Sequence, residues 1–219
     1  MSSTNRSTTL VRIAQFTLLS IIYYVVVSII LYFLRPDINP ISQTSVNYTV
    51  GPYGFLMISA FIIMALGQGA MVIGLNQGLP ESARSRIGLA LLGLWALGNL
   101  IAGLFRADLP GADQTIIGTI ALINGPIHIL CLIVGALLVS LKFRHDEMWR
   151  PIYRTALVLT LLMVVEFIGT FVTIATSVEI TGLIQRIFIV TVLAWVILVT
   201  MRLRTVGMEV ISAYAESVA

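Results

Sequence analysis

The residues of this chain that are able to do chemistry are few, and several lie inside one apolar stretch. Asn124 and His128 are four positions apart, so a helix would place both on one face, with Gly125 and Pro126 between them. Proline lacks the amide that would bond to the carbonyl of Leu122, which predicts a bend and a free carbonyl beside the histidine. An amide, an imidazole and a free carbonyl together would make a polar pocket.

The composition places this pocket in a membrane rather than in a soluble core. Hydrophobic residues make up 58% of the 219 residues and charged residues only 11%, against roughly 25% charged in soluble domains. A bilayer core about 30 Å thick requires about 20 apolar residues in a helix. Six stretches meet this requirement, at residues 13–34, 53–75, 87–105, 115–141, 152–175 and 183–201. We therefore predict an all-α polytopic membrane protein, a bundle of six transmembrane helices that forms one domain over residues 1–219.

The basic residues predict the orientation of the bundle. With the amino terminus inside, only Arg35, Arg106 and Arg186 of the 13 Lys and Arg residues fall on the outer side. Because basic loops are retained in the cytoplasm, we predict that both termini are cytoplasmic and that the protein lies in the inner (plasma) membrane. The basic excess then indicates contact with anionic lipids, and we expect no nucleic-acid partner.

The predicted spans bring His128 and Glu166 to similar depths. At 1.5 Å per residue, His128 lies roughly 20 Å from the outer start of its helix, and Glu166 roughly 21 Å from the inner start of the next helix. Polar groups at such depths face the bundle interior and are paired. Since antiparallel neighbours with a short connection pack together, we predict a hydrogen bond or ion pair between His128 and Glu166. The alternative is that Asn124 and His128 form interhelical hydrogen bonds that only hold the bundle together.

Charged residues also gather at the predicted outer ends of the helices. Asp113 is placed to cap the fourth helix, while Arg106 and Asp108 are able to pair with each other or with Arg35 and Asp37. If this cluster is exposed, it contributes little to stability. If it is partly buried, it is able to hold a polar headgroup or an ion.

Several kinds of site do not fit the residue inventory. A retinal Schiff base requires a lysine inside a span, but the one lysine, Lys142, lies at the inner end of the fourth helix. Haem held by two histidines is excluded because His145 lies in a loop. The single cysteine, Cys131, allows no intramolecular disulfide. A zinc site built around His128 would need three protein ligands to meet, and we expect neither a metal nor a cofactor.

Three segments carry a resemblance to a known family. They are SVNYTVGPYGFLM at residues 45–57, FRADLPG at 105–111 followed by GPIHIL at 125–130, and GLIQRIFIVTVLAW at 182–195. Together they span most of the chain, which resembles the prokaryotic membrane-protein family called domain of unknown function 998. The resemblance implies a six-helix bundle with recurring positions at Tyr48, Gly51, Tyr53, Gly54, Asp108, His128, Arg186 and Trp195. Arg106 stands where proline is expected before the aspartate, and the family name supplies no activity.

These patterns favour a non-enzymatic membrane protein with an outward-facing polar pocket. The pocket would bind a lipid or small amphiphile, or the protein would be an accessory subunit that contacts other membrane proteins. The predicted mouth consists of Arg106, Asp108 and Arg186, and the predicted floor of Asn124, His128 and Glu166. The alternative function is an intramembrane hydrolase that uses His128 with Glu166 or Asp108.

Overall fold

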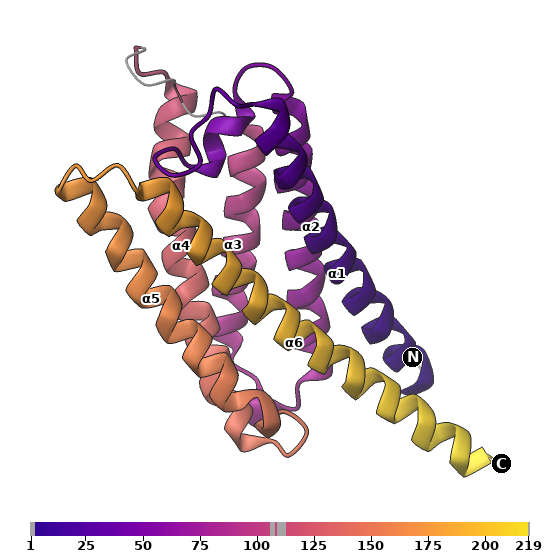
Figure 1. Ribbon diagram of the computed structural model, residues 1–219. Helices are drawn as coiled ribbons and strands as arrows, with labels where there is room; N and C mark the ends of the chain where they lie inside the picture. Colours follow the sequence, from indigo (N-terminus) through magenta and orange to yellow (C-terminus); the bar gives the residue numbers. More distant parts are fainter. Residues whose placement is uncertain (1–2, 106–107, 109–112, 219) are drawn as a thin grey trace.

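Six long α-helices follow the six predicted spans in the computed structural model, which describes residues 3–105, 108 and 113–218 (Figure 1). The helices are α1 (Ser3–Leu34), α2 (Gly54–Gly78), α3 (Arg86–Leu104), α4 (Ile116–Lys142), α5 (Tyr153–Ala175) and α6 (Thr181–Val218). Each of these described helices is long and apolar enough to cross a membrane. The predicted fold class, an all-α bundle of six transmembrane helices, is therefore confirmed.

Two helices run beyond their apolar stretches. α1 begins at Ser3 instead of residue 13, and α6 continues to Val218 instead of ending at residue 201. The two extensions pack against each other, since a Cβ atom on Gly207 would lie 3.1 Å from the carbonyl oxygen of Ser7. Packing of the two helices against each other thus supports both extensions. The predicted helices were shorter because the prediction used only the length of each apolar stretch.

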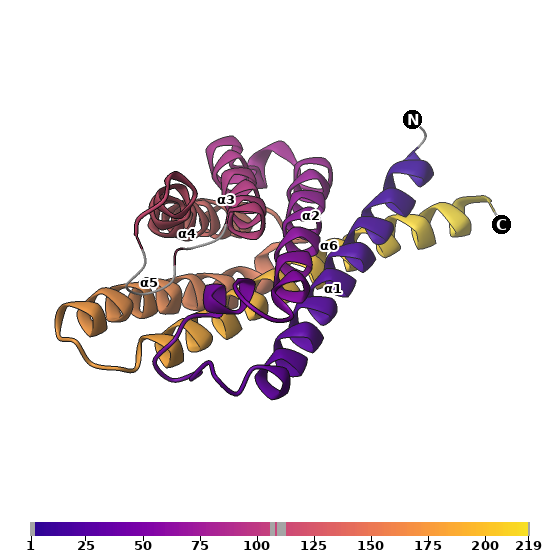
Figure 2. The same ribbon diagram turned by 90° about the horizontal axis from the view of Figure 1, so that it is seen from above.

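The helices form a ring in which each packs against its neighbours in the chain, and α6 returns to pack against α1 (Figure 2). α3 and α4 form one closely packed pair, whereas α5 packs mainly on α6 and less on α4. Fully buried side chains of Met71, Leu92 and Trp195 fill the interior of the ring. The Trp195 indole donates a hydrogen bond to Ser140 Oγ at 3.1 Å, which joins α6 to α4.

Residues 35–53 form a loop that covers the end of the bundle at which α6 begins (Figure 1). This 35–53 loop contains a short 3₁₀ helix, η1 (Ser45–Thr49). The Arg35 side chain is only 9% exposed, pairs with Asp37 at 2.7 Å, and donates hydrogen bonds to the carbonyls of Val50 and Pro52. The Leu183 amide donates to the carbonyl of Ile41 at 2.9 Å, so the loop is attached to the start of α6.

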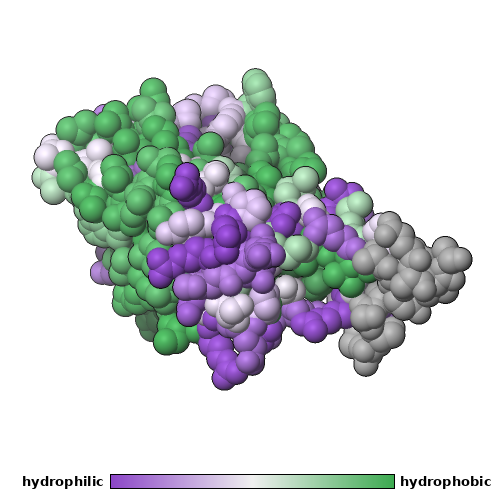
Figure 3. All heavy atoms as spheres, turned by 90° about the horizontal axis from the view of Figure 1, so that it is seen from below, coloured by the Kyte–Doolittle hydropathy of each residue, from purple (hydrophilic) through white to green (hydrophobic). Residues whose placement is uncertain are grey.

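The opposite end of the bundle is hydrophilic, as Figure 3 shows from below. It carries the first turns of α1 and three short 3₁₀ helices in its connections: η2 (Glu81–Ala83), η3 (Phe143–His145) and η4 (Arg150–Ile152). Its exposed basic residues include Arg86, Lys142, Arg144, Arg150 and Arg154. The apolar sides of the bundle meet this end as a hydrophobic rim.

Candidate functional site

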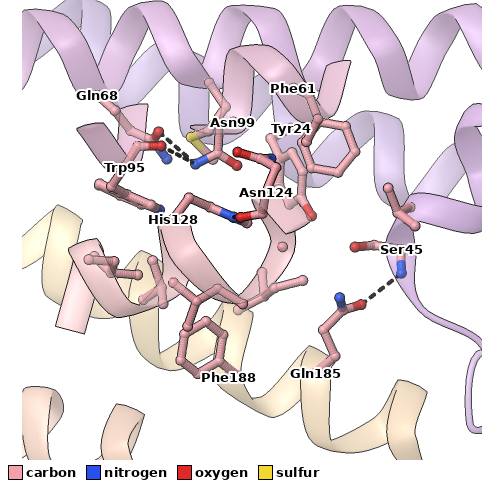
Figure 4. A pocket seen from close by; sticks show the side chains of 18 of the residues that line it. Tyr24, Ser45, Phe61, Gln68, Trp95, Asn99, Asn124, His128, Gln185 and Phe188 are labelled. Carbon is pink, nitrogen blue, oxygen red and sulfur yellow. Dashed lines mark hydrogen bonds between the residues drawn. The ribbon is translucent and has the colours of Figure 1, made fainter. Parts of the chain in front are cut away.

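A cavity of about 210 Å³ lies inside the helix ring, and we call it the central cavity. It is lined by residues of α1, α2, α3, α4 and α6 and by the 35–53 loop (Figure 4). Its polar lining residues include Ser45, Gln68, Asn99, Asn124, His128 and Gln185, and its aromatic residues include Tyr24, Phe61, Trp95 and Phe188. Among these described lining residues none is Asp, Glu, Lys or Arg, so the cavity presents uncharged hydrogen-bonding groups on an apolar wall.

The α3–α4 contact positions two of the predicted site residues. The Asn124 side-chain amide donates a hydrogen bond to the carbonyl of Gly98 at 2.9 Å. A Cβ atom on Gly98 would overlap His128, so α4 lies directly against α3 at this turn. His128 Nδ1 lies 2.8 Å from the carbonyl oxygen of Asn124. Because a carbonyl oxygen only accepts, Nδ1 is the donor, and Nε2 of the neutral ring remains an acceptor.

A second polar contact joins α2 and α3 in the wall of the same cavity. Asn99 Nδ2 donates a hydrogen bond to Gln68 Oε1 at 3.0 Å, and both side chains are buried. At the end near the 35–53 loop, the Ser45 amide donates to Gln185 Oε1 at 2.7 Å (Figure 4). Hydrogen bonds between separate elements therefore fix the polar groups at both ends of the central cavity.

The structure does not bring the predicted mouth and floor residues into one cluster. Asn124 and His128 line the central cavity, whereas Arg186 lines a neighbouring cavity between α1 and α6. Asp108 accepts hydrogen bonds from the amide and the hydroxyl of Thr115, at 2.9 and 2.8 Å. Glu166 does not line either cavity. Arg106 lies outside the described residues.

The predicted pairing of His128 with Glu166 is wrong. Glu166 Oε1 accepts a hydrogen bond from the hydroxyl of Thr191 on α6, at 2.7 Å, and His128 lies against α3. Among the described residues no hydrogen bond or ion pair joins the two. The reason is that α5 packs mainly on α6, where the Glu166 carboxylate finds its hydrogen-bond donor in Thr191.

The prediction that Asp113 caps α4 is also wrong. The residue that caps α4 is Thr115, whose hydroxyl accepts from the Gly118 amide at 2.9 Å, and not Asp113. Asp108 accepts a hydrogen bond from the hydroxyl of this capping residue, and Arg35 and Asp37 pair with each other. The predicted pairing of Asp108 with Arg106 lies outside the described residues.

Sequence reasoning missed several residues of the central cavity. Gln68 and Asn99 are polar residues within predicted spans, and this feature alone was sufficient reason to include them among the predicted site residues. Ser45 and Gln185 carry a weaker signal, since they lie in a loop and near a helix end. Tyr24, Phe61, Trp95 and Phe188 cannot be distinguished from ordinary core aromatics before their shared cavity is known.

No group of three or more His, Cys, Asp or Glu side chains that could hold a metal ion is found within the part of the chain that the structure describes. The polar groups of the central cavity are amides, hydroxyls and one imidazole. Their chemistry suits hydrogen bonding to an uncharged ligand group.

A family model described as "Protein of unknown function (DUF998)" matches residues 18–202, which include all of α2 to α5 and most of α1. No curated protein and no solved structure matches the chain.

Proposed function

The chain belongs to the DUF998 family, and we propose that it is a non-enzymatic membrane protein that binds a lipid or small amphiphile in its central cavity. The observation that carries this proposal is the lining, in which Gln68, Asn99, Asn124 and His128 face one space inside an apolar bundle. Each of these side chains makes at least one hydrogen bond inside the bundle, but an amide or an imidazole has further donors and acceptors, which hydrocarbon does not satisfy. A ligand with hydroxyl or amide groups would satisfy these remaining groups.

The size of the cavity limits the ligand. Its volume of about 210 Å³ is below the roughly 300 to 1,000 Å³ of pockets for drug-sized ligands. It therefore holds a headgroup or a short amphiphile rather than a whole two-chain lipid. The absence of charged residues among the described lining residues favours an uncharged headgroup.

The arrangement of acidic residues supports binding over hydrolysis. A hydrolase based on His128 would require Glu166 or Asp108 nearby as its partner. Each of these carboxylates instead accepts a hydrogen bond from a threonine, Thr191 or Thr115, and neither lines the central cavity. We place the protein in the plasma membrane of a prokaryotic cell, with the 35–53 loop on the outer side.

A cavity-filling substitution tests the proposal. Gly125 lines the central cavity, and a Cβ atom built there meets no atom within 4 Å, so a side chain at this position begins in open space and we expect Gly125→Leu to occupy part of the cavity. The protein is extracted without detergent and transferred to mild detergent, and native mass spectrometry then detects a retained small molecule. We expect an adduct on the wild type and its loss from Gly125→Leu.

Gly93→Leu is the matched control, because Gly93 is also a helix residue with open space at Cβ but does not line the cavity. This variant should retain the adduct. Absence of any adduct from the wild type, or equal retention by Gly125→Leu and Gly93→Leu, would overturn the proposal.

A further inference from the structure

A second cavity, of about 160 Å³, lies beside the central cavity between α1, α6 and the 35–53 loop. We call it the lateral cavity. Its polar lining residues are Tyr24, Ser28, Tyr32, Ser45, Tyr48 and Arg186. Unlike the central cavity, it contains a cationic side chain, so the two cavities suit ligands of different charge.

The Arg186 guanidinium is fixed by neutral groups. Nε donates to the hydroxyl of Tyr32 at 3.1 Å, and Nη1 donates to the carbonyls of Gln43 and Gly182, each at 2.9 Å. The guanidinium carbon also lies 5.4 Å from the centre of the Tyr32 ring. These contacts orient the cation but leave its charge without a counterion, since no described carboxylate forms an ion pair with Arg186.

Two hydrogen-bond donors of the lateral cavity have no described partner. Nη2 of Arg186 and the hydroxyl of Tyr48 are both buried, and neither makes a hydrogen bond of normal geometry within the described part of the chain. The Tyr48 side chain is only 2% exposed. Burial raises the pKa of the Tyr48 phenol, while the charge of Arg186 and a weaker side-chain interaction between Arg186 and Tyr48 lower it. Tyr48 therefore keeps its proton at neutral pH and lies within electrostatic range of Arg186.

The lateral cavity borders the lipid-facing surface of the bundle. Val25 and Ile29 of α1 and Val190 of α6 line it and are 37%, 49% and 66% exposed. Arg186 is five residues after Thr181, which places it about 8 Å along α6 from the helix start. The cation thus lies near the level of lipid headgroups, with apolar side chains leading from it towards the bilayer.

We propose that the lateral cavity binds the oxyanion of an amphiphile, a carboxylate or phosphate, through Arg186 Nη2 and the Tyr48 hydroxyl. The alkyl chain lies outside, along the exposed surface formed by Val25, Ile29 and Val190. The volume of the lateral cavity supports a headgroup inside and an alkyl chain outside, because a cavity of roughly 150 Å³ takes up only a molecule as small as benzene. An oxyanion supplies both the missing counterion and the missing acceptors.

The two cavities share the lining residues Tyr24, Ser45, Ile189 and Leu193. The oxyanion site does not rest on the proposed function, since Arg186 and Tyr48 do not line the central cavity. The test uses the purified full chain and four probes: hexadecanoate, hexadecyl phosphate, hexadecanol and inorganic phosphate. Binding of each probe is measured by titration with native mass spectrometry. We expect at least one of the anionic amphiphiles to bind about tenfold more tightly than hexadecanol.

Two substitutions connect this binding to the cavity. Arg186→Gln should weaken binding of the anionic amphiphile by about ten- to a hundredfold, because a charged hydrogen bond and the counter-charge are lost. Tyr48→Phe keeps the ring and removes only the hydroxyl, so we expect about three- to tenfold weaker binding. Arg86→Gln, which removes the same charge from an exposed side chain at the opposite end of the bundle, should have no effect.

The outcomes separate the possible ligands and decide the proposal. Competition by millimolar inorganic phosphate would assign the site to a free oxyanion, whereas lack of competition assigns it to the amphiphile headgroup. If Arg186→Gln does not fold, Tyr48→Phe carries the test alone. Equal binding of hexadecanol and both anionic probes, or unchanged binding by Tyr48→Phe and Arg186→Gln, would overturn the proposal. Retention of the central-cavity adduct by Arg186→Gln would show that the two sites are separate.

Discussion

Asn99 on α3 donates a hydrogen bond to the side-chain oxygen of Gln68 on α2 at 3.0 Å, and both amides are almost completely buried. Replacing Asn99 by leucine leaves the Gln68 amide without this partner inside the membrane. We expect Asn99→Leu to lower the free energy of unfolding by about 1 to 2 kcal/mol. Unfolding in mixed micelles, followed by circular dichroism, measures the change.

The double variant Gln68→Leu with Asn99→Leu is the control for this pair. Because it removes both polar groups, it should be less destabilised than the sum of the two single variants. Strict additivity would show that the two amides are not coupled.

The close approach of α3 and α4 at Gly98 gives a second prediction. Since a methyl group there would overlap His128 and lie 3.2 Å from Asn124 Oδ1, Gly98→Ala forces the helices apart. We expect a loss of about 1 to 3 kcal/mol of stability, as in other overpacked contacts. Gly93→Ala, on the same helix with open space, should be neutral or stabilising because alanine favours helix. Equal stability of the two variants would contradict the packing at Gly98.

The Arg35–Asp37 pair predicts how the 35–53 loop responds to acid. The hydrogen bond from Arg35 lowers the pKa of Asp37 below its ordinary value of 3.8. The contribution of the pair is therefore complete above that value and is lost only as the pH falls through the lower pKa of the folded protein. Hydrogen exchange of the Asn47 and Val50 amides, which bond within the loop, should accelerate beyond the intrinsic rate only in this acidic range.

Asp37→Asn separates the charge from other effects of acid. This variant should exchange faster than the wild type at neutral pH and should show little further change on acidification. An unchanged loop in Asp37→Asn would mean that the contacts of Arg35 with Val50 and Pro52 are sufficient to hold it.

The orientation predicted from the basic residues is tested by cysteine labelling of intact cells. Cys131 is first replaced by serine, and single cysteines are then introduced at Asn39 and Glu147, which are exposed at opposite ends of the bundle. A membrane-impermeant maleimide should label Asn39→Cys in intact cells and Glu147→Cys only after lysis. The reverse pattern would place the 35–53 loop in the cytoplasm.

The sequence was sufficient to predict the spans but not which helix faces which. Apolar length fixes where a chain crosses a bilayer, because the backbone must satisfy its own hydrogen bonds there. The same reasoning gave similar depths for His128 and Glu166, but depth leaves the direction of each side chain undetermined. His128 on α4 lies against Gly98 of α3, and Glu166 on α5 bonds to Thr191 of α6. The direction of each side chain therefore depends on α3 and α6, and not on the packing of α4 against α5 that the prediction used.

The 35–53 loop illustrates a second limit. Its content of Pro, Asn and Ser predicts turns, but nothing in these residue types indicates that Arg35 is buried and binds the carbonyls of Val50 and Pro52. Every residue has a backbone carbonyl, so the sequence does not indicate which carbonyls accept hydrogen bonds from Arg35. The position of Arg186 near the start of the last helix was predictable from the sequence, whereas its separation from His128, in a different cavity, was not.

The packing of α6 against α1 has a consequence for biosynthesis. α6 supplies Gln185 and Phe188 to the central cavity and Arg186 to the lateral cavity, yet it is made after the five other helices. During translation and insertion, α1 to α5 can enter the membrane while both cavities still lack a wall. The ring closes only when the last helix meets the first, so a ribosome-bound chain that stops before α6 has neither cavity.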